Sequence, residues 1–228
     1  MKLAPKLIIF DVDGVLVDVR GSFHKSIVET VHFFTGRRVT YAGIHEWKNK
    51  SGYNDDWRLT TDWIASLGKD IPYEEVKARF QKMYWGTKSR PGNVARERWL
   101  ITHKRLERWS RRAELALFTG RTRHELRYTL GGTEARKIFR RAVTMDDVKK
   151  GKPDPEGLRL LLDGMPKRDA LYLGDNIDDA LSAKRARVPF LGVLPHGSEA
   201  HQARAKRLRE LGALDILHSV RDLEKLLA

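Results

Sequence analysis

The stretch 7-LIIFDVDGVLVD-18 decides the expected fold, because it places four apolar residues directly before two acids. Four apolar residues without polar alternation indicate a short strand that is buried on both faces. Asp11 and Asp13 follow this strand one residue apart, and Gly14 then turns the chain. The two carboxylates are therefore expected at the edge of a sheet, where they could bind a divalent cation or serve as nucleophile and acid/base.

Further apolar runs, separated by stretches of helical character, occur at 115–118, 170–173, 188–194 and 214–217. Strands that alternate with helices predict an α/β fold, a doubly wound parallel sheet of the Rossmann type with helices on both faces. Ligands of such sheets bind beyond the carboxyl ends of the strands. A polar residue directly after a strand is therefore a candidate for the functional site.

Residues 18–90 interrupt this alternation. Phe23, Ile27, Val31 and Phe34 form one helical stripe that Gly36 can end, and a second amphipathic helix runs from near Pro72 to Gly86. We therefore predict a small all-helical cap domain over 18–90, inserted after the first strand of a core that comprises 1–17 and 91–228. The SRPG stretch at 89–92 is the expected linker back to the core.

Composition narrows the class of protein. The chain has 228 residues, of which 41% are hydrophobic and 32% charged, and no apolar run approaches the roughly 20 residues of a membrane span. The first apolar stretch is too short for a signal peptide, so we expect a cytoplasmic protein with no membrane partner. The absence of cysteine excludes disulfides and thiolate metal sites.

The net charge of +14 favours anionic partners. Its basic clusters all fall within expected helices, where charge usually forms a solvated face, so specific nucleic-acid binding is not expected. A monomer is the default expectation, with a dimer as the alternative.

Polar residues follow the later strands as well. Thr119, Gly120 and Arg121 come directly after 115–118, and a hydroxyl, an amide and a guanidinium at a crevice form a site for an anionic oxygen. Lys152 precedes Pro153, which holds the lysine in an extended segment. Its ammonium could offset phosphate charge, although a single lysine of this kind is most often a surface residue.

The stretch GDNIDD, 174–179, adds three acids. Asp175 follows a strand and a glycine, while Asp178 and Asp179 fall in the first turn of the next helix, where carboxylates favour the helix dipole. Capping accounts for one of these acids and not for all three. The additional carboxylates indicate a metal site.

The order of DVDGV, FTGR, KPDP and GDNIDD along essentially the whole chain resembles the haloacid dehalogenase-like superfamily. The helical insert resembles the cap of its phosphoglycolate phosphatase and β-phosphoglucomutase branch. This resemblance implies a Mg²⁺-dependent phosphoric monoester hydrolase that works through an aspartyl-phosphate.

The resemblance also implies roles for single residues. Asp11 is the expected nucleophile and Asp13 the acid/base. Thr119, with the Gly120 amide and Arg121, is expected to hold the phosphoryl oxygens, and Lys152 to offset charge. The expected Mg²⁺ ligands are Asp11, Asp175 and Asp13 through its carbonyl, together with Asp179, which would order the metal waters or Lys152.

Asp13 excludes the dehalogenases and P-type ATPases of the superfamily, which lack an acid at this position. A phosphatase and a phosphomutase of the β-phosphoglucomutase type remain. A helical cap favours small phosphorylated metabolites, and its loop at 48–57 offers Lys50 and Asn54 as substrate-binding candidates, although any surface turn has a similar composition. A non-catalytic, basic, nucleic-acid-binding protein on the same fold is a further alternative, against which the complete motifs argue.

Overall fold

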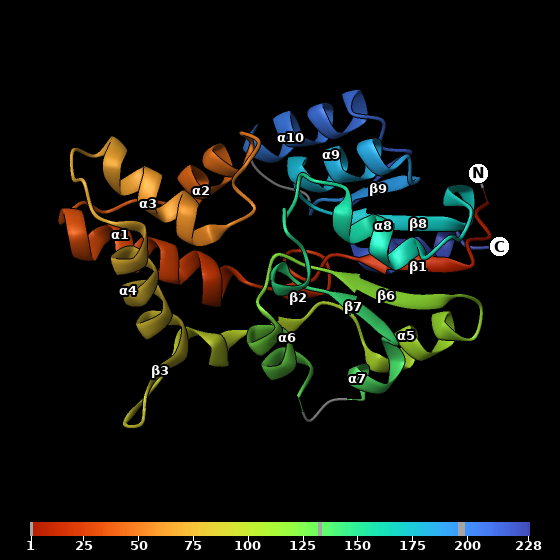
Figure 1. Cartoon of the computed structure of the whole chain (residues 1–228), viewed down its shortest axis with the longest axis horizontal. Helices are drawn as coiled ribbons and strands as arrows, with labels where there is room; N and C mark the ends of the chain where they lie inside the picture. The colour runs from red at the N-terminus through yellow and green to blue at the C-terminus, as the bar shows by residue number, and fades with distance from the viewer. Residues whose placement is uncertain (1, 132–133, 196–198) are drawn as a thin grey trace. The chain divides into compact units, whose positions relative to one another are not determined.

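The computed structural model describes residues 2–131, 134–195 and 199–228, and the chain divides into two compact units. Unit 1 comprises Met1–Val17 and Trp99–Ala228, and unit 2 comprises Asp18–Arg98. The chain passes between the units at two short strands that pair with each other, β2 (Val17–Asp18) and β5 (Arg98–Trp99). Figure 1 follows the chain through both units, which are described separately below.

Unit 1 is built on a six-stranded sheet in the order β10-β9-β8-β1-β6-β7, in which every neighbouring pair is parallel. This confirms the predicted doubly wound α/β fold. The strands are β1 (Leu7–Phe10), β6 (Glu114–Phe118), β7 (Arg141–Val143), β8 (Ala170–Gly174), β9 (Phe190–Val193) and β10 (Ile216–Leu217). Five of them fall on the predicted apolar runs, and β7 is the strand that sequence reasoning missed.

The central position of β1 follows from its composition. All four of its residues are fully buried, because the strand has a neighbour on each edge and helices on both faces. On one side of β1 the strands follow in the order β6, β7. On the other side they follow in the order β8, β9, β10, so the strand order reverses between β1 and β8. Order reversal of this kind creates a crevice beyond the carboxyl ends of β1 and β8.

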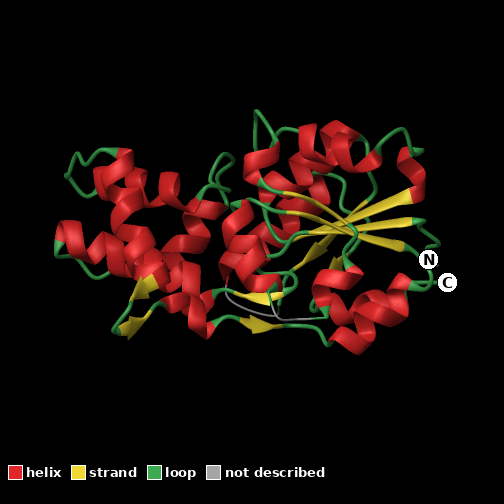
Figure 2. Cartoon of the chain, turned by 60° about the horizontal axis from the view of Figure 1, so that its bottom comes forward, coloured by secondary structure: helices red, strands yellow, loops and turns green. Residues whose placement is uncertain are grey.

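Helices cover both faces of this sheet, as Figure 2 shows. Leu7 and Ile9 point into a core shared with α8 and α9, whereas Phe10 stacks on Trp109 of α5 at 6.0 Å between ring centroids. Alternate residues of β1 therefore serve opposite cores. The helices of unit 1 are α5 (His103–Ser110), α6 (Arg123–Leu130), α7 (Ala135–Ile138), α8 (Glu156–Leu162), α9 (Ile177–Ala186) and α10 (Glu199–Glu210), with 3₁₀ turns at Met145–Asp147, Lys167–Asp169 and Val220–Lys225.

Unit 2 is mainly helical. Gly36 ends its first helix in the left-handed conformation, with φ of 69°, and Pro72 and Gly86 flank the last helix as predicted. Its elements are a π-helical turn at Arg20–His24, α1 (Lys25–Thr35), α2 (Tyr41–Lys48), α3 (Asp56–Ser66), α4 (Tyr73–Trp85), the hairpin strands β3 (Gly86–Thr87) and β4 (Arg90–Pro91), and a 3₁₀ turn at Asn93–Arg96.

The second boundary of this unit lies eight residues beyond the expected one, at 98/99 instead of 90/91. The SRPG stretch forms a hairpin rather than a linker, so the unit is not all-helical. Residues after the hairpin are bonded into the same unit, since Asn93 donates to Glu29 at 2.7 Å and Tyr84 to Glu97 at 2.9 Å.

Within the described ranges, no helix has the length and apolar character needed to cross a membrane.

Candidate active site

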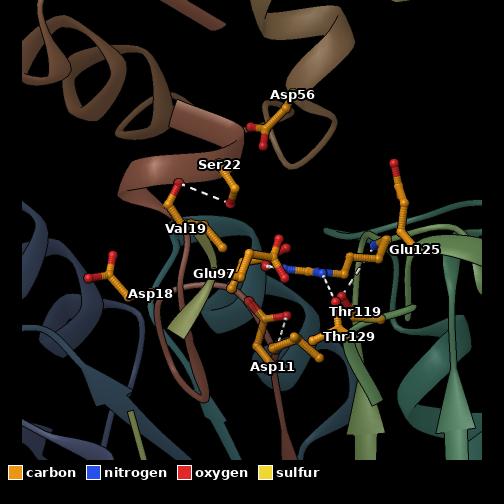
Figure 3. Close-up of polar contacts among 12 residues, drawn as sticks. Asp11, Asp18, Val19, Ser22, Asp56, Glu97, Thr119, Glu125 and Thr129 are labelled. Carbon is orange, nitrogen blue, oxygen red and sulfur yellow. Dashed lines mark hydrogen bonds and ion pairs between the residues drawn. The ribbon is translucent and has the colours of Figure 1, made fainter. Parts of the chain in front are cut away.

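Asp11 follows β1 directly and is fixed at the strand end by two contacts. Its amide donates to the carbonyl of Leu173 at 2.8 Å, which extends the pairing of β1 with β8 by one residue. Its carboxylate Oδ1 accepts the amide of Val12 at 2.8 Å, a bond drawn in Figure 3. Because Asp11 is only 5% exposed, a buried carboxylate lies at the end of the central strand.

Lys152 supplies the positive charge beside this carboxylate. Its Nζ lies 2.9 Å from Asp11 Oδ1 and 2.7 Å from Asp179 Oδ1, and the lysine is itself buried. Burial alone would lower the pKa of Lys152, but the two carboxylates raise it above its usual range. The ammonium is therefore charged at neutral pH, as a buried cation with two anionic partners can be.

Negative charge nevertheless exceeds positive charge around Asp11. Burial raises the pKa of its carboxyl well above the usual value, the Lys152 ammonium opposes this rise, and the carboxylates of Asp179, Asp13 and Asp175 add to it. A bound cation would balance this excess of carboxylates.

Three carboxylates form a group that could hold such a cation. Asp11, Asp175 and Asp179 each offer an oxygen, and these atoms lie within 4.8 Å of one another. Gly14 makes the group possible, because its φ is 75° and a Cβ there would come within 2.6 Å of Asp175 Oδ2. Carboxylate oxygens are ligands that Mg²⁺ prefers, so these residues fit the predicted metal.

Asp179 already has several donors. Its Oδ1 accepts the hydroxyl of Tyr172 at 2.6 Å and faces Lys152, while its Oδ2 accepts the amides of Asp175 at 3.1 Å and Asn176 at 3.0 Å. A carboxylate has about four acceptor positions, so these contacts fill them. The contacts favour Asp11 and Asp175 as direct ligands and Asp179 as the support of Lys152 and of the loop after β8.

Thr119 and Gly120 follow β6, the other neighbour of β1. Thr119 is 1% exposed, and its amide donates to the carbonyl of Val143 at 3.0 Å, which continues the pairing of β6 with β7. Figure 3 draws Thr119 at the end of its strand. Among the described residues, the Gly120 amide donates to no acceptor, so it is available to an anionic oxygen.

Arg121 is placed differently from the prediction that it binds phosphate. Its Nε and Nη2 donate to Asp13 Oδ1 at 2.9 and 2.6 Å, and its Nη1 donates to the hydroxyl of Thr129. The side chain is fully buried, and a buried guanidinium requires partners for its charge. As a consequence, the Asp13 side chain is bonded to Arg121 and is not part of the carboxylate group of Asp11, Asp175 and Asp179.

The two substrate-binding candidates of the insert, Lys50 and Asn54, lie in unit 2 between α2 and α3. The Lys50 ammonium lies over the ring of Trp47, 3.9 Å from its centroid. The loop that carries Asn54 is held at its ends, because Lys48 pairs with Asp56 at 2.8 Å and Asp55 caps α3. Their role in binding stays a prediction.

Sequence reasoning missed Tyr172, Thr129 and Arg204. Arg204 is 2% exposed, and its Nη1 lies 3.9 Å from Asp175 Oδ2. The helical spacing of Arg204, Leu208 and Leu211 placed this arginine on the buried stripe of α10, which was a signal that could have identified it. A tyrosine in the middle of a buried strand likewise indicates a hydroxyl in need of a partner.

The arrangement of the site and the comparison with known proteins agree. Residues 5–187 match the haloacid dehalogenase-like hydrolase family, and the chain belongs to that family. This confirms the family and the hydrolytic enzyme predicted from the four motifs.

Individual relatives are named as phosphatases or as an enzyme of a phosphorylated compound. The chain is 29% identical to phosphoglycolate phosphatase 1 of Pseudomonas aeruginosa over 81% of its own length and 67% of that protein. It is 30% identical to an imidazoleglycerol-phosphate dehydratase of Phytophthora nicotianae over 82% of its own length, but it spans only 43% of that protein. Among solved structures, the phosphatase Tt82 of Thermococcus thioreducens is 26% identical, with a TM-score of 0.64 over 89% of this chain and 99% of that one.

Proposed function

We propose that this protein is a Mg²⁺-dependent phosphatase that hydrolyses a small phosphorylated metabolite through an aspartyl-phosphate on Asp11. One observation carries the proposal: Asp11 is buried at the end of the central strand, paired with Lys152 at 2.9 Å and grouped with Asp175. The phosphatase names of related proteins support the same reaction.

In the first step, a carboxylate oxygen of Asp11 attacks phosphorus while the bond from phosphorus to the leaving oxygen breaks. Asp13 gives a proton to that oxygen, so the alcohol leaves as a neutral molecule. In the second step, water attacks phosphorus, Asp13 takes a proton from it, and the bond to Asp11 breaks. Inorganic phosphate is released and both carboxyl groups return to their first state.

The remaining residues bind and orient the phosphoryl group. The Thr119 hydroxyl and the Gly120 amide face its oxygens, and the Lys152 ammonium balances the charge on them and on Asp11. Mg²⁺ would be held by Asp11 and Asp175, and when bound it supplies positive charge for the oxygens of the transferring group. Asp179 keeps Lys152 and the loop after β8 in place.

Two measurements test this proposal. Hydrolysis of an aryl phosphate is measured with Mg²⁺ and with a chelator, on the unaltered protein and on Asp11→Asn. We expect metal-dependent release of phosphate, reduced at least about a thousandfold by the substitution, because no nucleophile remains. Mass spectrometry of acid-quenched protein should find one added phosphoryl group on the peptide that contains Asp11, and none in the variant.

To identify the substrate, phosphate release is measured with a panel of phosphate monoesters. The panel includes phosphoglycolate and imidazoleglycerol phosphate, the compounds in the names of two relatives. Transfer of the phosphoryl group to a second sugar phosphate, without release of inorganic phosphate, would indicate a phosphomutase. Absence of metal-dependent turnover on the whole panel would refute the proposed function.

A further inference from the structure

Arg121 contacts Asp13 in a way that the proposed reaction does not yet use. Two of its nitrogens, Nε and Nη2, donate to the same oxygen, Oδ1, at 2.9 and 2.6 Å. Its third nitrogen, Nη1, donates to Thr129 Oγ1 on α6, and the backbone amide of Arg121 donates to Thr119 Oγ1 at 3.2 Å. Figure 3 shows the dashed lines that reach Thr119 and Thr129.

The guanidinium is well fixed. Its side chain is fully buried, and its carbonyl accepts the amide of Met145 at 3.0 Å, so both the main chain and the head group are held. By contrast, the Asp13 side chain is 25% exposed. The buried partner therefore determines the orientation of the exposed one, since a rigid planar fork fixes the carboxylate that accepts from it.

The two oxygens of Asp13 differ as a result. Oδ1 accepts from two positively charged N–H groups, and among the described residues Oδ2 accepts from none. A proton on Oδ1 would compete with these donors, whereas a proton on Oδ2 would not.

We infer that Arg121 is a positioning residue for the acid/base step: it binds Oδ1 of Asp13 and leaves Oδ2 as the oxygen that gives its proton to the leaving group and takes one from water. This inference rests on the proposed function and replaces the expected role of Arg121 as a phosphate ligand. Thr129 supports the arginine from α6.

The test uses the dependence of the rate on the leaving group. An alkoxide is a poor leaving group, so its oxygen must receive a proton as it departs, whereas an activated phenolate departs with little assistance. The value of kcat/KM reports the step in which the leaving group departs. We measure it with an alkyl phosphate and an activated aryl phosphate for the unaltered protein, Arg121→Lys, Thr129→Val, Asp13→Asn and the double variant of Arg121→Lys with Asp13→Asn.

We expect Arg121→Lys to reduce kcat/KM about a hundredfold for the alkyl phosphate and less than about tenfold for the aryl phosphate, in line with the usual contribution of a general acid. Thr129→Val should show the same selectivity at a smaller size. In the Asp13→Asn background, Arg121→Lys should cause little further loss, because the group that it positions is gone. Inhibition by inorganic phosphate should stay unchanged.

Arg127→Gln, an exposed arginine of α6, is the matched control and should leave the ratio of the two substrates unchanged. Equal losses on both substrates, a loss that persists in the Asp13→Asn background, or weaker inhibition by phosphate would overturn the inference and return Arg121 to phosphate binding. These outcomes require an active unaltered protein; if it hydrolyses neither ester, the proposed function fails first and the inference with it.

Discussion

Asp179 is the residue at which most contacts of the site converge, and Tyr172 contributes the shortest of its hydrogen bonds, at 2.6 Å. Burial, followed by the charge of Asp179, raises the pKa of the Tyr172 hydroxyl well above its usual value, so the hydroxyl remains a donor. Tyr172 thereby stabilises a buried carboxylate that also pairs with Lys152.

Replacing Tyr172 by Phe should therefore reduce stability. The substitution removes one donor to a buried charge, so we expect the free energy of unfolding to fall by about 2 kcal/mol. Urea denaturation monitored by circular dichroism measures this change. Tyr53→Phe is the control, because that hydroxyl bonds Asp62 at 3.1 Å where water can replace it. An equal effect of the two substitutions would contradict the importance of the buried position.

At the scale of elements, α8 lies against β6 at a glycine. A Cβ on Gly157 would come within 2.2 Å of the Phe118 ring, and this ring also lies below the Lys152 ammonium, 4.8 Å from its centroid. The absence of a side chain at 157 therefore allows the helix to approach the strand that carries Thr119.

Gly157→Ala should consequently destabilise the protein, although alanine is the better helix former by about 1 kcal/mol. Overpacking against Phe118 typically costs about 1–3 kcal/mol, so we expect the midpoint of urea unfolding to fall to a lower urea concentration. Gly151→Ala is the control, because nothing lies within 4 Å of its added Cβ and its φ is not positive. A stabilised Gly157→Ala variant would show that the helix can move away from the sheet at little cost.

A polar contact joins the 3₁₀ turn at Val220–Lys225 to α5. Trp109 Nε1 donates to Glu224 Oε2 at 2.7 Å, and this bond, with help from Arg108, lowers the pKa of the Glu224 carboxyl. A carboxyl whose pKa is lower in the folded state contributes stability above its unfolded pKa of about 4.3 and loses it as the pH falls.

Glu224→Gln should therefore be less stable than the unaltered protein at neutral pH, by about 0.5 kcal/mol because the pair is partly exposed. This difference should shrink as the pH falls below about 4.3. Thermal unfolding at a series of pH values measures it, with Glu107→Gln, exposed on α5, as the control for net charge. A difference that is independent of pH would mean that the charge of Glu224 does not contribute.

Elements differ in how far the sequence determines them. The run LIIF predicts its strand correctly, because a central strand with helices over both faces of the sheet must be apolar on both of its faces. By contrast, β7 is an edge strand of three residues that begins with Arg141 and follows Arg140, so its pairing with β6 depends on the assembled sheet. The late boundary at 98/99 has a similar cause, since Asn93 is bonded to Glu29, which lies 64 residues earlier in the chain.

The site shows the same limit. Sequence reasoning placed Asp11, Thr119 and Asp175 directly after strands, and one topological rule brings the ends of parallel strands to one edge of the sheet. The partner of Arg121 could not be predicted from the sequence, because a charged residue beside a crevice can bind either a ligand or a neighbouring carboxylate. The assembled fold places the guanidinium between Thr129 of α6 and Asp13.

At the scale of the whole molecule, a cation held by the group of Asp11, Asp175 and Asp179 would couple metal binding to folding. Three carboxylate oxygens within 4.8 Å repel one another in the metal-free protein, and only the folded chain brings them together. A cation that binds the folded state alone adds stability that grows with its concentration, about 2.7 kcal/mol at a hundred times its dissociation constant.

Mg²⁺ should therefore raise the melting temperature, and a chelator should lower it again. Asp175→Asn should remove most of this shift, because one of the carboxylates that would hold the cation is gone. Differential scanning calorimetry measures both effects, with Asp70→Asn, an exposed acid of unit 2, as the control for net charge. An equal shift in Asp175→Asn and the unaltered protein would place the stabilising ion elsewhere in the molecule.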